Sequence, residues 1–438
     1  MSQACLDSDA DERAAALVRS ACSSDPGLAC ELLAADPGLG RHDLACGCVT
    51  GDGDHVTALL DAGPELTRAE LPPVGHAPIL YVAFTRLGRV QPERVAGIRT
   101  AARALLDAGA DPNASFDHEG WLQAPVYGAA GIANDAVLTR MLLDAGADPN
   151  DVYADADPRI GEALYHACEF PDPACAALLV DAGTERPAVR RCLGRALNFP
   201  NEVMVEMLCE HGARPTSGHL HQAVLRRRPV RTVRVLLDAG APVDRPNEAG
   251  RTALANAVRW GSNDVAELLR SRGADPASVS SGDRELGSYL SGDGAPPAGK
   301  AVGVDRLLDW AIQGGDAVGV RRLLDAGAAV EGDPDDEHPP IGQAAWRGYA
   351  EVVHEFVARG ARLTFPHGGS AMGAALHGSR HCHDPEGGPT MRTVQEVPVE
   401  RYARVVEILL EAGAPVPERI DDEPPVASLL EALGIRRS

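Results

Sequence analysis

A short pattern of apolar and polar positions, Leu-Leu-Asp-Ala-Gly, recurs along this chain of 438 residues. The leucines continue an apolar stripe at helical spacing, and a glycine directly after such a stripe is typical of the end of a helix. In the regular stretches these glycines lie about 33 residues apart, which indicates a stacked repeat protein. The pattern, complete or loosened, ends at Gly63, Gly109, Gly146, Gly183, Gly212, Gly240, Gly273, Gly327, Gly360 and Gly413.

The segment 247–276 shows most clearly what one repeat contains. Thr252 is a suitable N-cap for a first helix that is apolar on one side. Gly261 ends this helix, and a second one-sided helix runs to Gly273, where a positive φ is favoured. Such short helices are not stable alone, so each repeat needs a neighbour to cover its apolar face.

The order of small, apolar and turn residues within the repeat follows a known family. It is found at Gly250–Leu254, Ala257–Val258, Gly261, Leu268–Leu269 and Gly273–Pro276, with partial copies at Ala124–Tyr127, Gly146–Asn150 and Pro340–Ile341. In these residues the chain resembles the ankyrin repeat proteins, from about residue 12 to 417. The resemblance implies an all-α solenoid of about ten to eleven helix-turn-helix units with short β-hairpin-like finger loops.

The chain also departs from the family pattern. The family's Thr-Pro-Leu-His is complete nowhere, although His221 takes the histidine position in one repeat. Tyr127, Tyr165 and Ala255 take that position in others.

The irregular steps between glycines divide the chain. We expect an N-terminal capping unit at 1–40, a first stack of repeats at 41–276 and a second stack at 305–417. The Ser-, Gly- and Pro-rich segment 277–304 is either a hinge or a degenerate repeat. The second stack contains an insertion at 378–400, and residues 418–438 form a C-terminal cap.

Composition narrows the classes of partner. The formal net charge of −22, from 63 acidic and 41 basic residues, disfavours nucleic acid and anionic membranes. No run is long and apolar enough to span a membrane, and the first residues lack the apolar core of a signal peptide. We therefore expect a cytoplasmic monomer that binds another protein and uses no cofactor. Lys300 is the only lysine, a bias typical of GC-rich, bacterial coding.

The resemblance also implies where a partner would bind. In ankyrin repeats the residues that end each first helix line a concave groove, and aromatic and Arg residues there are typical of interaction hot spots. The alternative is that these rings pack against the next repeat. The candidates for partner binding are Phe170, Phe199, Arg226, Arg259, Trp260, Trp346, Arg347 and His377.

A basic cluster in the middle of the stack could receive an acidic peptide or a phosphate. The alternative is an ordinary solvated surface with local ion pairs. The cluster consists of Arg190, Arg191, Arg195, Arg226, Arg227, Arg228, Arg231 and Arg234.

The best candidate for chemistry is a group of possible metal ligands, His377, His381, Cys382 and His383. The first two are spaced i,i+4 and would share a helix face, but paired Cys-x-x-Cys or His-Glu-x-x-His spacing is absent. We therefore expect a non-catalytic scaffold that binds a partner protein on its concave face. The alternatives are a metal-binding or enzymatic module at 377–384, and an acidic inhibitor or immunity protein that masks a basic partner.

Overall fold

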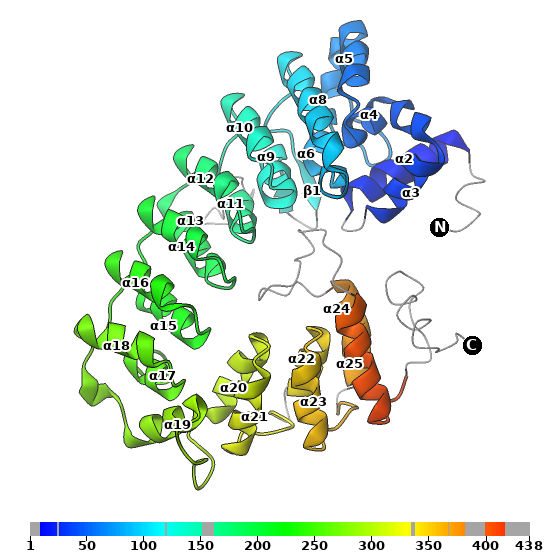
Figure 1. Cartoon of the computed structure of the whole chain (residues 1–438). Helices are drawn as coiled ribbons and strands as arrows, with labels where there is room; N and C mark the ends of the chain where they lie inside the picture. Colours follow the sequence, from blue (N-terminus) through cyan, green and yellow to red (C-terminus); the bar gives the residue numbers. More distant parts are fainter. Residues whose placement is uncertain are drawn as a thin grey trace. The chain divides into compact units, whose positions relative to one another are not determined.

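The computed structural model describes residues 9–23, 26–118, 121–150, 162–333, 338–366, 368–381 and 399–416. Nearly all of the regular structure is helical, and the helices follow one another in antiparallel pairs (Figure 1). The described residues divide into two compact units. The first unit holds the residues up to Ala196 together with Val203–Ala213, and the second holds Leu197–Glu202 and the described residues from Arg214 onward.

The first unit begins with two helices in the place expected for an N-terminal cap, α2 and α3. A two-stranded antiparallel hairpin, in which Phe116 pairs with Gln123, precedes the short helix α9. The α-helices and strands are α2 (Ala10–Cys22), α3 (Gly27–Ala35), α4 (Leu44–Thr50), α5 (Gly53–Ala62), α6 (Pro78–Phe84), α7 (Leu87–Val90), α8 (Val95–Asp107), β1 (Phe116–His118), β2 (Trp121–Gln123), α9 (Pro125–Tyr127), α10 (Ala136–Asp144), α11 (Glu162–Ala167), α12 (Ala174–Asp181), α13 (Arg186–Ala196) and α14 (Glu202–Glu210). Shorter turns are η1 (Pro37–Arg41), η2 (Pro64–Arg68), η3 (Pro92–Arg94) and the π-helical η4 (Gly128–Ala133).

The second unit continues the pairs with one interruption, the single helix α19. Its elements are α15 (Ser217–Leu225), α16 (Val230–Asp238), α17 (Ala253–Arg259), α18 (Asn263–Ser271), η5 (Pro276–Ser278), α19 (Ser281–Ser291), α20 (Val304–Gln313), α21 (Ala317–Asp325), α22 (Pro340–Trp346), α23 (Ala350–Ala358), α24 (Ala371–His381) and α25 (Val399–Glu411).

Glycine ends the second helix of each pair, as the sequence pattern predicted. Nine of the ten pattern glycines have a positive φ, for example 89° at Gly273 and 92° at Gly327. The exception is Gly63, which has a φ of −154° and leads directly into Pro64. At the other end of a pair, the hydroxyl of Thr252 accepts a hydrogen bond from the backbone of Ala255 and caps α17 as expected.

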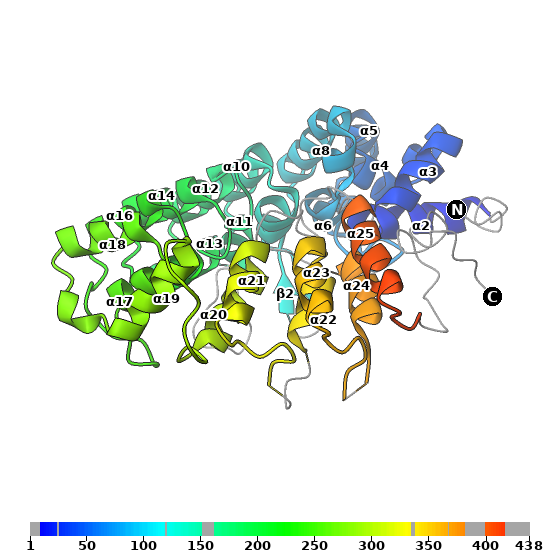
Figure 2. The ribbon, with the colours of Figure 1, turned by 60° about the horizontal axis from the view of Figure 1, so that its bottom comes forward.

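The stack is held together by contacts between the first helices of successive pairs and between their second helices. In the second unit α20 contacts α22 and α22 contacts α24, while α21 contacts α23 and α23 contacts α25 (Figure 2). One apolar core runs through these helices, with Leu323, Val352, Phe356 and Val405 among its fully buried side chains. No repeat has a closed core of its own, which is the property of a solenoid.

The helix α19 lies within the segment 277–304 and has no partner helix of its own. It packs against α17 and α21. A Cβ built on Gly287 would lie 1.8 Å from the carbonyl oxygen of Val258, so glycine allows the two backbones to touch. On the opposite side Arg322 donates to the carbonyl of Leu290, and the Tyr289 hydroxyl donates to Asp325 over 3.2 Å. The hinge and the degenerate repeat both stay predictions for this segment.

Parts of two expected regions lie outside the described residues. These are the insertion at 378–400, of which only 378–381, 399 and 400 are described, and the C-terminal cap at 418–438.

The close approach of α19 to α17 gives a test of the core. Gly287→Ala forces a Cβ against a backbone oxygen, so it should lower the free energy of unfolding by about 1–3 kcal/mol. That corresponds to a loss of about 2–12 °C in the melting temperature of a unit of this size, measured by circular dichroism or calorimetry.

The matched control is Gly282→Ala on the same helix, where an added Cβ meets only the Ser280 hydroxyl at 3.9 Å. This variant should be neutral or slightly stabilising, because alanine favours a helix over glycine. Equal melting temperatures for the two variants would show that α19 does not pack on α17 as described.

Candidate functional site

A groove of about 510 Å³ lies in the second unit, and four segments of the chain form its walls. Helix α15 supplies one side, α20 supplies the other, and α17 contributes side chains with the finger loop 246–251 that precedes it. Leu225, Leu307 and Trp310 make its apolar part, and the rest is polar or charged. Its volume falls in the range of about 300–1,000 Å³ that is usual for ligand pockets.

The groove forms where α20 lies beside the end of α15, although α16, α17, α18 and α19 separate these two helices in the sequence. The guanidinium of Arg226 lies 4.9 Å from the centre of the Trp310 ring, and its Nη2 donates to the Gln313 amide oxygen over 3.2 Å. Arg227 pairs with Asp316 over 2.5 Å. These contacts join residues almost 90 positions apart and close one end of the groove.

The backbone of Arg227 has a φ of 53°, which is rare for a residue with a side chain. Other pairs have a glycine at this turn, such as Gly261 with a φ of 66° and Gly315 with a φ of 64°. An Arg in this conformation costs about 1–2 kcal/mol. The ion pair with Asp316 and the cation–π contact with Trp260, at 5.6 Å, favour the Arg side chain here.

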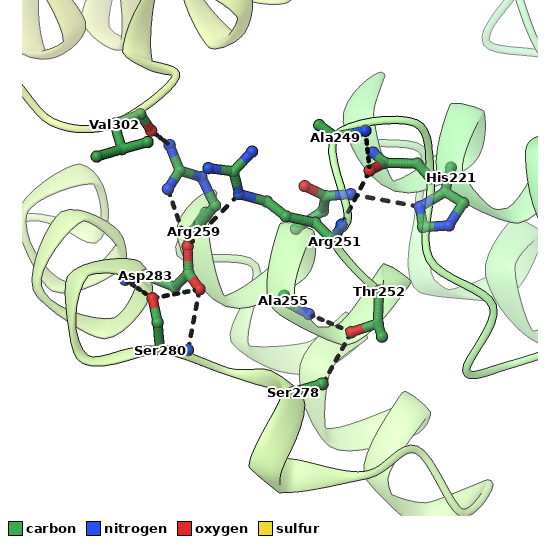
Figure 3. Close-up of polar contacts among 12 residues, drawn as sticks. His221, Ala249, Arg251, Thr252, Ala255, Arg259, Ser278, Ser280, Asp283 and Val302 are labelled. Atoms are coloured by element: carbon green, nitrogen blue, oxygen red, sulfur yellow. Dashed lines mark hydrogen bonds and ion pairs between the residues drawn. The ribbon is translucent and has the colours of Figure 1, made fainter.

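An ion pair between Arg259 of α17 and Asp283 of α19 lies next to the groove (Figure 3). Arg259 Nη1 lies 2.8 Å from Asp283 Oδ1, and the two side chains are only 4% and 6% exposed. Nη2 of the same guanidinium donates to the carbonyl oxygen of Val302, directly before α20. One side chain of α17 therefore holds both the start of α19 and the approach to α20.

Both oxygens of the Asp283 carboxylate accept hydrogen bonds. Its Oδ2 accepts hydrogen bonds from the hydroxyl and the backbone N–H of Ser280, at 2.6 and 3.0 Å, in a capping box. Burial by itself would raise the pKa of Asp283, but the hydrogen bonds from Arg259 and Ser280 outweigh burial and hold the pKa below its ordinary value. The pair is therefore charged at neutral pH.

The floor of the groove is fixed by a buried histidine. His221 Nε2 donates to the carbonyl oxygen of Arg245 over 2.8 Å, and Nδ1 accepts from Asn256 Nδ2 over 3.3 Å. Burial lowers the pKa of His221, which agrees with a neutral ring that donates once and accepts once. The histidine therefore positions the Asn256 amide and ties α15 to α17.

Three guanidinium groups gather at the groove. Arg251 and Arg259 both point toward Asp283, with Arg251 Nε 3.9 Å from its Oδ1 (Figure 3). Arg306 of α20 lines the same groove, and Glu248 of the finger is the acidic residue among the lining side chains. Burial, followed by repulsion from Arg259, lowers the pKa of Arg251 from its ordinary value. The groove is thus locally positive in an acidic chain.

Four of the side chains predicted to contact a partner are buried. Trp260 is 3% exposed and belongs to the apolar cluster that also holds Leu286 of α19 and Val304 of α20. Phe170 is 2% exposed and lies under the guanidinium of Arg89 at 4.9 Å, and Phe199 is 7% exposed. Arg259 is the fourth. Their burial favours the packing alternative, while partner binding by these residues stays a prediction.

The other predicted residues are more accessible. Arg226 is half-buried against Trp310. Trp346 and Arg347 are half-buried neighbours at the end of α22, with the guanidinium 5.4 Å from the ring centre. His377 is exposed on α24.

The predicted basic cluster is largely engaged within each unit. In the first unit the guanidinium groups of Arg191 and Arg195 lie over the Tyr165 ring, and Arg195 also pairs with Glu169 over 2.7 Å. In the second unit Arg228 donates to the carbonyl oxygens of 197 and 198. These contacts are the local pairing that the sequence analysis raised as the alternative.

The candidate metal ligands fall mostly outside the description. Cys382 and His383 lie beyond the described residues, and for His381 only the backbone is described, at the end of α24. Within the described ranges no group of three or more His, Cys, Asp and Glu residues could hold a metal ion. The cysteines in those ranges form no disulfide, and burial raises the pKa of several, that of Cys175 to about 12, which does not suit a reactive thiolate.

Trp310 and Arg306 line the groove but were not among the residues predicted from the sequence. The concave positions were expected at the end of each first helix, which for α20 means its last residue Gln313 and the C-cap Gly314. Trp310 lies one helical turn earlier on the same face as Gln313, so extending the rule back by one turn would have found it. Arg306 lies a further turn back.

The burial of two tryptophans predicts different losses of stability on their replacement by alanine. Trp260→Ala should lower the free energy of unfolding by about 3–5 kcal/mol, because it empties the core between α17, α19 and α20. Trp310→Ala should cost clearly less, since Trp310 is only half-buried. Thermal unfolding of both variants measures the difference, and equal losses would contradict the assignment of Trp310 to the groove surface.

The hydrogen bonds of His221 predict its titration. Its folded pKa lies below the unfolded value of about 6.5, so the stability it contributes is present above that pH and is lost as the pH falls below it. An NMR titration of the ring should give a midpoint below 6.5, whereas a midpoint above 6.5 would contradict the neutral ring described here.

Two comparisons with known proteins found a similarity. Residues 193–280, which include α15 and α17, match the family model of ankyrin repeats in three copies. The solved ankyrin repeat domain of Bcl-3, described as a unique member of the IkappaB protein family, is similar over 44% of this chain and 86% of that chain. The identity is 25% and the TM-score is 0.35. No curated protein matches.

The helix pairs with positive-φ glycines continue on both sides of the matched segment. No helix in the described ranges is long and apolar enough to cross a membrane. Residues 193–280 thus match ankyrin repeats, and the described residues on both sides continue as largely helical pairs.

Proposed function

We propose that this chain is a non-catalytic scaffold that binds a partner protein in the groove between α15, α17 and α20. Ankyrin repeats are generally protein–protein interaction modules. The observation that carries the proposal is the groove itself, where a half-exposed Trp310 and several Arg side chains line a preformed cavity. Trp and Arg are the residue types most enriched in interaction hot spots.

The rigidity of the walls supports binding without rearrangement. The buried ion pair of Arg259 with Asp283 and the contacts of Arg226 with α20 hold the walls in place before a partner arrives. A preformed surface loses less conformational entropy on binding than a flexible one. The side chains of Trp346 and Arg347, on the next first helix, extend the candidate surface beyond the groove.

The two alternatives have less support in the described residues. Of the four candidate metal ligands at 377–384, only His377 has a described side chain. An acidic inhibitor would use the net charge of −22, but the groove itself gathers Arg251, Arg259 and Arg306. The groove is therefore the better candidate for the binding surface.

Site-specific crosslinking tests the proposal on the full chain. A photo-reactive amino acid is placed at Ala249, an exposed finger residue that lines the groove. The control position is Val318 on α21, which is 52% exposed and belongs to a second helix. In the cells that produce the protein, we expect Ala249 to crosslink to a partner, identified by mass spectrometry, and Val318 not to do so.

Adding Trp310→Ala should reduce the crosslink yield at Ala249 at least about tenfold, because a hot-spot tryptophan typically contributes about 2 kcal/mol or more. The melting temperature of this variant must be measured alongside. Equal crosslinking at Val318, or a yield at Ala249 that does not depend on Trp310, would refute binding in the groove.

A further inference from the structure

The groove has the opposite charge from the chain around it. Arg251, Arg259 and Arg306 line it, against Glu248 at the rim and Asp283 behind the wall. Because charges more than about 8–10 Å apart are largely screened at physiological salt, a ligand inside the groove responds to these groups and not to the distant net charge.

Asp283 shows what these guanidinium groups recognise. One carboxylate of the chain itself accepts a hydrogen bond from Arg259 Nη1 over 2.8 Å and lies 3.9 Å from Arg251 Nε. The planar guanidinium fork matches a carboxylate, and such charge-assisted hydrogen bonds are about twice as strong as neutral ones. Asp283 pairs with Arg259, which is buried. The guanidinium groups that can still bind a ligand carboxylate are therefore those of Arg251 and Arg306.

These two guanidinium groups can be reached from the groove. Arg306 is exposed and has no hydrogen bond or ion pair among the described residues. Within those ranges the guanidinium of Arg251 has only the long ion pair with Asp283, and it is subject to repulsion from Arg259 and Arg306. A carboxylate placed between Arg251 and Arg306 would relieve this repulsion.

The size and rim of the groove favour an extended peptide. A volume of about 510 Å³ holds a few side chains and not a folded domain. Small residues at the rim, such as Gly218, Ala249 and Gly303, leave room for a backbone to pass. Trp310 offers an apolar ring next to the charged groups, and Gln222 lines the groove with its amide.

Resting on the function proposed above, we propose that the groove binds an acidic peptide segment of the partner, with an Asp or Glu carboxylate held by Arg306 and Arg251. The ring of Trp310 packs against the aliphatic part of a side chain in the same peptide segment. The partner is therefore recognised by a short acidic stretch, although the chain as a whole is acidic.

Fluorescence anisotropy with the full chain tests this inference. The probes are labelled hexaglutamate, hexaglutamine and hexalysine peptides at about 150 mM salt. Hexaglutamate should bind and the other two should not. Arg306→Gln should weaken hexaglutamate binding about tenfold, since it removes one charge-assisted contact, and Glu248→Gln should strengthen it. The matched control is Arg270→Gln on α18, exposed and outside the groove, which should leave binding unchanged.

Each other outcome overturns the inference. Failure of hexaglutamate to bind, or an equal loss with Arg270→Gln, would show that the groove does not select a carboxylate. Binding of free glutarate as tightly as hexaglutamate would replace the peptide with a small carboxylate ligand. Stronger binding of a phosphoserine peptide than of hexaglutamate would replace the carboxylate with a phosphate.

The crosslinking experiment separates this inference from the proposed function. If Ala249 crosslinks to a partner and Arg306→Gln leaves that crosslink unchanged, the groove binds a protein by other chemistry and only the carboxylate assignment fails. If Ala249 forms no crosslink, the proposed function fails.

Discussion

The second unit depends on one buried ion pair, that of Arg259 with Asp283. An ion pair with both side chains almost fully buried is weak evidence for net stability, because removing two charges from water costs several kcal/mol per ion. Its value here is geometric. The guanidinium contacts Asp283 at the start of α19 and the carbonyl of Val302 before α20. It therefore links α19 and α20, which do not form a regular helix pair. Without it, α20 would keep only its apolar packing on Trp260 and the contacts of Arg226 and Arg227, and this wall of the groove would be less well fixed.

The local features of this fold could be predicted from the sequence. Helix ends depend on neighbouring residues, so the capping hydroxyl of Thr252 and the positive φ of Gly273 follow from the repeat pattern alone. The pattern failed locally only at Gly63, where the following Pro64 starts a 3₁₀ turn and the glycine takes a negative φ.

The groove could not be predicted, because it depends on contacts between distant residues. The rule for concave positions assumes that each first helix lies beside the next one. The single helix α19 breaks this regularity and brings α20 against the end of α15, which covers Trp260 and places Trp310 at the groove. Arg259 showed no sign in the sequence of being buried, since its partner Asp283 lies in a segment that resembles a linker. The long step from Gly273 to Gly327 marks an irregularity in the sequence, and Arg227 stands where the repeats with Gly261 and Gly315 have glycine, but neither feature shows where α20 lies.

The unpaired helix α19 also bears on how the second unit unfolds. In a solenoid each repeat is stabilised by its nearest neighbours, so cooperativity is set by the weakest junction in the row. Between α18 and α20 that junction contains one helix where other junctions have two, and polar contacts add to its apolar packing around Trp260 and Leu286. The repeats on its two sides would melt as one body only while those contacts hold. Arg259, which lines the groove, therefore also helps to set the size of the cooperative folding unit.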